Sequence, residues 1–158
     1  MAIQKVDGVD AYNNFPSKFI TVYSTTAVAA GEVVMLDFSV NRNPLQSTDA
    51  FGFSVKKATA TANLSTAVGV ATQTILAAGY VQIQYAGFCA LPTCEAGTTI
   101  TVGKFVGSSD ATAGAIQEFT DATAVTGAVA PFAICVDAYS AATNDGAIVI
   151  LDKGYFNG

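Results

Sequence analysis

Histidine and tryptophan are both missing from this chain of 158 residues. Without histidine, the Ser-His-Asp and Cys-His relays of nucleophilic catalysis cannot form, and the commonest zinc ligand is absent. A phosphate-binding loop is missing too, because Thr98 stands where such a loop would need glycine five positions before Gly103. The sequence therefore predicts no catalytic residue, no cofactor and no metal site.

Paired carboxylates need a separate test, because a glycosidase requires only two positioned acidic residues. The acidic residues near predicted strands fall mostly at strand ends or beside turns, where a solvated carboxylate is the ordinary outcome. They are Glu32, Asp37, Glu95, Glu118, Asp137 and Asp152. Without tryptophan, aromatic platforms for sugars are few. We expect a protein that is not an enzyme, with a carbohydrate hydrolase as the catalytic alternative.

Ionised side chains are scarce, since charged residues make up 12% of the chain against about 25% in a typical soluble domain. Apolar types reach 51% and the mean hydropathy is +0.44. Long apolar runs are nevertheless absent, which excludes a membrane-spanning helix, and the aromatic girdles of an outer-membrane barrel are missing. These features predict extensive burial against protein partners, both copies of this chain and a larger assembly, rather than against a membrane.

Positive charge is also sparse, with 7 basic residues against 12 acidic ones and a formal net charge of −5. Affinity for nucleic acid comes mainly from clustered Lys and Arg, and Lys56-Lys57 is the single adjacent basic pair. We therefore expect no nucleic-acid partner. The first residues lack the pattern of a signal peptide, so we expect synthesis in the cytoplasm.

Three cysteines are too few for a disulfide framework. Cys89 and Cys94 flank a connection that contains Pro92, which could bring their Cβ atoms close together. A disulfide between them and a pair of reduced thiols are both open. Cys135 lies inside an apolar run, which predicts a small core residue.

Residues 1–20 form an N-terminal arm, because Asp7-Gly8, Asn13-Asn14 and Pro16 interrupt any strand period. A wholly solvated tail would rarely carry Tyr12 and Phe15. We expect the arm to lie on a neighbouring copy, and packing on its own barrel is the alternative.

From Phe19 onward, β-branched residues dominate and turn residues recur about every ten positions, which is typical of an antiparallel sandwich or barrel. No stretch has a helical period, so the predicted fold is all-β, a single small β-barrel over residues 21–158. Asn144-Asp145-Gly146 predicts a hairpin turn. The predicted strands are 19–23, 33–38, 51–56, 67–72, 80–86, 99–102, 105–106, 115–119, 131–138 and 147–151.

An internal repeat relates two halves of the chain, at about 24–89 and 96–156. The run that contains Gly31 matches the run that contains Gly103, and Gly79 with its following strand matches Gly146 with its own. Because neither half alone could cover both faces of its sheet, two related half-barrels that form one closed core are the economical interpretation.

The matched segments resemble the small head-decoration, or capsid cement, proteins of tailed bacteriophages. The resemblance covers nearly everything after the arm and rests on Ala30-Gly31-Glu32-Val33-Val34, Ala67-Val68-Gly69-Val70-Ala71 and Ala78-Gly79-Tyr80-Val81-Gln82, followed by a looser second round. It implies a β-barrel or tulip-like protein, commonly a homotrimer, on the outer capsid surface of the virion, where it staples neighbouring major capsid proteins. The family has no catalytic residues to carry over.

Two departures from the family pattern stand out. Ala133 occupies a position where the second round would carry glycine, and residues 41–48 form a long insertion that is a candidate contact loop.

The main functional alternative is a tail-fibre or receptor-binding domain of a phage particle. A bacterial surface subunit is a further one. Aromatic residues are the candidate partner contacts, with core packing as their alternative role: Tyr12, Phe15, Phe19, Phe51, Phe53, Tyr155 and Phe156.

Overall fold

The computed structural model describes residues 16–39, 54–62, 64, 66–90, 92–119, 131–140 and 145–154. These residues form strands and loops without a helix, so the predicted all-β class is confirmed. Each of the ten strands overlaps one that the sequence predicts. They are β1 (Lys18–Ser24), β2 (Val33–Leu36), β3 (Ser54–Lys57), β4 (Ala67–Ala71), β5 (Gly79–Cys89), β6 (Thr99–Ile100), β7 (Phe105–Ser108), β8 (Ile116–Glu118), β9 (Ala133–Ser140) and β10 (Asp145–Ile150).

The first five strands close into a barrel in the order β1-β3-β2-β4-β5, because β1 also pairs with β5. β1 runs antiparallel to β5 along its whole length, from Lys18 opposite Ala86 to Ser24 opposite Gly79. Its other edge pairs in parallel with β3, where Tyr23 stands opposite Ser54. Aliphatic side chains fill the interior, among them Val22, Val34, Leu36, Val55, Val68, Val81 and Ile83.

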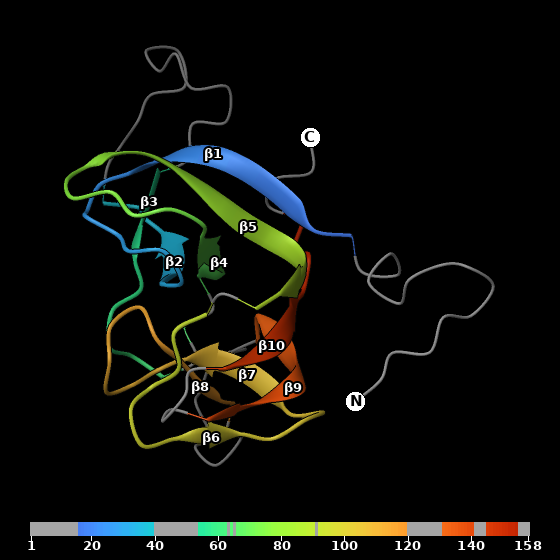
Figure 1. Cartoon of the computed structure of the whole chain (residues 1–158). Helices are drawn as coiled ribbons and strands as arrows, with labels where there is room; N and C mark the ends of the chain where they lie inside the picture. The colour runs from blue at the N-terminus through green and yellow to red at the C-terminus, as the bar shows by residue number, and fades with distance from the viewer. Residues whose placement is uncertain are drawn as a thin grey trace.

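The second five strands repeat this order of pairing. β7 pairs with β8 and with β9, and β9 pairs with β10, as β2 pairs with β3 and β4, and β4 with β5. Two segments take the place that β1 has among the first five strands. The end of β5 lies antiparallel to β10, and Cys94 forms a parallel bridge with Ile116 of β8. We call β1–β5 the first barrel and β6–β10 with the end of β5 the second barrel; Figure 1 shows them stacked.

β4 is buried along its entire length because it lies between the two barrels. Val68 and Ala71 face the core of the first barrel, whereas Ala67 and Val70 belong to the core of the second. This position explains why the strand is a continuous run of small and apolar residues instead of an alternating one.

Backbone hydrogen bonds join the barrels. The N–H of Val33 donates to the carbonyl of Gly114 at 2.8 Å, and the N–H of Gly114 donates to that of Ala58 at 2.9 Å. In addition, the N–H of Thr93 donates to the carbonyl of Gly31 at 2.9 Å. The two barrels are thus joined by a shared strand, a shared core and these bonds.

The predicted hairpin between the last two strands is present, but its predicted turn residues need a correction. Asp145 and Gly146 are the first residues of β10, with Asp145 opposite Ser140, and do not form the turn. Gly146 has a φ of 151° and lies against the ring of Tyr139, so a Cβ at this position would overlap the ring. The glycine therefore serves close packing on Tyr139 instead of a tight turn. Asn144 lies outside the described residues.

Candidate interaction surface

A row of apolar side chains crosses the outer face of the second barrel. Phe88 of β5 stands opposite Val149 of β10, Val149 opposite Ile134 of β9, and Ile134 opposite Phe105 of β7. We call Phe88, Val149, Ile134 and Phe105 the outer apolar row. Their chain neighbours Cys89, Ile148, Cys135 and Val106 all belong to the buried core. Because side chains alternate along a strand, the row lies on the opposite face of the sheet from this core, and Val149 is buried there.

Exposure varies along the row and is greatest at Phe105, whereas Phe88 and Ile134 are half-buried. Val149 is 8% exposed and Phe105 is 49% exposed. Val136, two residues beyond Ile134 on β9, is 38% exposed. The N–H of Phe119 donates to the carbonyl of Phe105 at 2.8 Å, which adds another aromatic residue at the far end. Exposed aromatic and aliphatic side chains are thus adjacent to one another on this face, the pattern of an interaction surface and not of scattered exposed residues.

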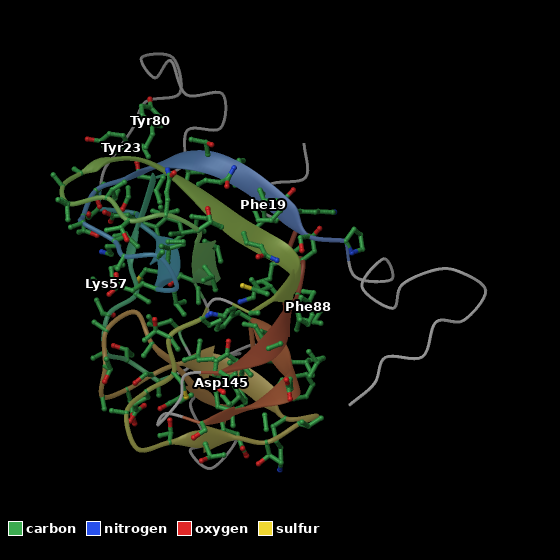
Figure 2. All side chains as sticks on the ribbon, in the orientation of Figure 1. Phe19, Tyr23, Lys57, Tyr80, Phe88 and Asp145 are labelled. Atoms are coloured by element: carbon green, nitrogen blue, oxygen red, sulfur yellow. The ribbon has the colours of Figure 1, made fainter. Side chains whose placement is uncertain are left out.

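The chain enters the described fold beside the first member of the row. The hydroxyl of Ser17 donates to the carbonyl of Phe88 at 2.9 Å, and the Gln84 side-chain amide donates to the same carbonyl at 2.6 Å. Gly87 has a φ of 86°, and a Cβ there would overlap the carbonyl oxygen of Pro16. Glycine is therefore required where the entering segment crosses β5. Figure 2 places Phe88 at the outer side of the junction between β5 and β10.

The first barrel carries a different aromatic feature. Tyr23 of β1 and Tyr80 of β5 stand opposite each other, with ring centroids 5.5 Å apart in an edge-to-face arrangement. Figure 2 shows the pair at the end of the molecule away from the second barrel. Such a geometry stabilises the β1–β5 pairing by about 1 kcal/mol beyond area burial.

Asp37, the first residue after β2, carries a buried carboxylate. Asp37 accepts hydrogen bonds from the Thr25 hydroxyl at 2.5 Å and from the N–H and hydroxyl of Ser39 at 3.0 and 2.6 Å. Lys56 lies 3.3 Å away. Burial alone would raise the pKa of Asp37, but the hydrogen bonds from Ser39, Thr25 and Lys56 outweigh it and hold the pKa well below its ordinary value of 3.8. The residue acts as a structural clamp.

Ion pairs occupy matching places in the two barrels with their charges exchanged. Glu32 precedes β2 and pairs with Lys57 of β3 at 3.0 Å, whereas Lys104 precedes β7 and pairs with Glu118 of β8 at 3.8 Å. Lys57 stands opposite Val34, as Glu118 stands opposite Val106. The second pair is more exposed than the first.

The core of the second barrel holds the three cysteines and Tyr139. All three side chains are buried thiols, and no disulfide joins Cys89 to Cys94. Cys135 is fully buried as predicted, and burial raises the pKa of its thiol. The Tyr139 hydroxyl is buried without a hydrogen-bond partner in the structure. Burial, followed by the nearby Cys89 and Cys94, raises the pKa of Tyr139 above its usual value.

Among the aromatic residues predicted as partner contacts, Phe19 is described, and it is 51% exposed on β1. The others lie outside the described residues: Tyr12, Phe15, Phe51, Phe53, Tyr155 and Phe156. Sequence reasoning missed the outer apolar row, because its four members are far apart in the chain. The signal that could have found them is the outward-facing position on each predicted strand, once the strand order is known.

Two further observations concern the described part of the chain. No group of three or more His, Cys, Asp or Glu side chains in it is arranged to hold a metal ion. None of its segments is a helix long and apolar enough to cross a membrane.

The described part of the chain is thus an all-β protein in which a closed five-stranded barrel shares one strand with a second set of paired strands. The crystal structure of the N base of head fiber gp8.5 from bacteriophage phi29 has a similar fold, with a TM-score of 0.50 and 15% sequence identity over 87% of this chain and 96% of that one. No protein-family model and no curated protein sequence matches the chain.

Proposed function

We propose that this chain is a structural virion protein of a tailed bacteriophage that stands on the outside of the capsid. The observation that carries the proposal is the likeness of its fold to the base of a phage head fiber, over 87% of the chain. The sequence resemblance to phage head-decoration proteins reaches the same class independently.

The finer proposal is that the protein binds the lattice of the major capsid protein as a homotrimer and stabilises it. The low share of charged residues, 12%, and the outer apolar row both support burial against other protein surfaces. A protein that binds the mature lattice better than its precursor stabilises the shell by mass action, by about 2.7 kcal/mol per site at a concentration 100 times its Kd.

Purified capsids that lack this protein provide the test. Added protein should co-sediment with the capsids to a saturating ratio, and the loaded capsids should release their genome at a higher temperature than bare ones. Averaged electron micrographs should place the added mass on the outer capsid surface. Density on tail fibres would favour the tail-fibre or receptor-binding alternative, and a lack of saturable binding to any part of the particle would refute the proposal.

A further inference from the structure

Within the described part of the chain, the far end of the outer apolar row is exposed. Phe105 is 49% exposed there and Val136 is 38% exposed. The row crosses four strands, so it spans about 14 Å at the usual strand spacing, or about 19 Å with Phe119. A surface of this shape fits a narrow chain that lies across the strands.

The N-terminal sequence carries a matching pattern. Apolar side chains occur at every third position, at Ile3, Val6, Val9, Tyr12 and Phe15, and the positions between them are polar or small. An extended chain with three residues per turn rises 3.1 Å per residue, which brings every third side chain to the same side about 9.3 Å apart. Two strand spacings measure about 9.6 Å. Successive apolar residues of the segment would therefore meet every second strand of the row.

We propose that the outer apolar row of one copy binds the N-terminal segment, residues 3–15, of a second copy. This inference rests on the self-association in the proposed function and names the surfaces that mediate it. Fifteen residues reach up to about 50 Å, far more than the row requires.

The point of entry favours a second copy over the chain's own row. Pro16 and Ser17 already pack on Gly87 and Phe88 at the near end of the row. A residue before proline favours extended conformations, which disfavours an immediate reversal of the chain at this point onto the same copy. Because the entry point and the row lie side by side, copies that face each other with this side can exchange segments reciprocally, or around a closed ring.

Cross-linking in the purified protein, without capsids, tests the exchange. One batch carries Tyr12→Cys, a second carries Phe105→Cys with a mass tag, and the two are mixed and oxidised. We expect a cross-linked heterodimer from the mixture at several times the yield of dimers from either batch alone. The native thiols are buried and should stay silent. No excess heterodimer, or a chain with both substitutions that closes on itself as a monomer, would overturn the inference.

A second variant keeps the result independent of one cross-link. Phe105→Thr with Val136→Thr retains residues that favour strands and should weaken self-association at least tenfold by sedimentation equilibrium. The matched control is Leu76→Thr, since Leu76 is 91% exposed on the first barrel away from the row, and it should leave association unchanged. Equal association of both variants contradicts the inference. Capsid binding is scored separately, so segment exchange without capsid binding refutes the proposed function alone.

Discussion

The two barrels follow one order of strand pairing but close in different ways. In the first, β1 pairs with β5 over its full length and with β3 in parallel. In the second, the end of β5 pairs with Ile148, Val149 and Ile150, and a single bridge joins Cys94 to Ile116. The first barrel is thus closed by a strand of its own, β1, whereas the second is closed by the end of β5, a strand that also belongs to the first barrel. The same order of strand pairing therefore allows a barrel to close through a long strand pair or through a short pair and a single bridge.

The interiors differ in composition. Aliphatic side chains fill the first barrel, while the second also holds three thiols and the Tyr139 ring. Burying a polar group without a partner costs free energy, and each barrel has one such group among its described residues, the hydroxyl of Ser54 on β3 and that of Tyr139 on β9. Substitutions at matching positions can test whether this difference in design is a difference in stability.

The largest effect is expected at a matching position of the two barrels, where the first carries glycine and the second carries alanine. Gly69 stands opposite Val34, and Ala133 stands opposite Val106. A Cβ at Gly69 would overlap the carbonyl oxygen of Gln84. Gly69→Ala should therefore lower the free energy of unfolding by about 3 kcal/mol through overpacking. The counterpart Ala133→Gly should lose about 1 kcal/mol through backbone entropy. Urea unfolding measures both, and equal losses would contradict the packing difference.

Asp37 should give the next largest effect and a pH dependence that belongs to the first barrel. Asp37→Asn weakens a buried clamp and should cost about 2 kcal/mol at pH 7. Because folding lowers the pKa of Asp37, its contribution is complete well above the ordinary value of 3.8 and is lost as the pH falls through and below that value. Thermal unfolding between pH 7 and pH 2 should show a smaller drop for the variant. The exposed Asp145→Asn serves as control and should follow the parent curve.

The exchanged ion pairs provide a smaller contrast. Lys57→Glu places two carboxylates together at a half-buried site and should cost about 1 kcal/mol, whereas Lys104→Glu at the more exposed site should cost about 0.3 kcal/mol. Adding Glu32→Lys to the first variant should restore part of the loss. High salt should reduce both effects, and a salt-independent loss would show that packing, not charge, is responsible.

Tyr139 is the one position where we expect no loss of stability. Tyr139→Phe removes a buried hydroxyl that has no hydrogen-bond partner, so the free energy of unfolding should stay unchanged or rise by up to about 1 kcal/mol. Chemical denaturation would measure the change. A clear loss of stability would mean that the hydroxyl is satisfied in solution, for instance by a bound water.

The strands were predictable from the sequence because their residues alternate or form β-branched runs. The end of β5 was not: Gly87 indicates a break after Ala86, yet the strand continues to Cys89. The glycine is present because Pro16 crosses the strand, a contact between residues about 70 positions apart that no local pattern reports. The internal repeat stays a prediction, and the equal pairing order of the barrels supports it.

The candidate surface was less accessible to sequence reasoning than the fold. A single exposed aromatic residue such as Phe19 can be proposed from the sequence alone. The outer apolar row forms only because the register of four strands places its members opposite one another. Ile134 looks like a core residue in the sequence, because apolar neighbours flank it on both sides, and Val149 with the same kind of neighbours is in fact buried. The strand order had to be known before the outward direction of Ile134 could be recognised.

The strand β5 has one more consequence. It is a wall of both barrels, pairing with β1 and β4 at one end and with β10 at the other. Opening either barrel disturbs a strand that the other also uses, so we expect the two barrels to unfold together.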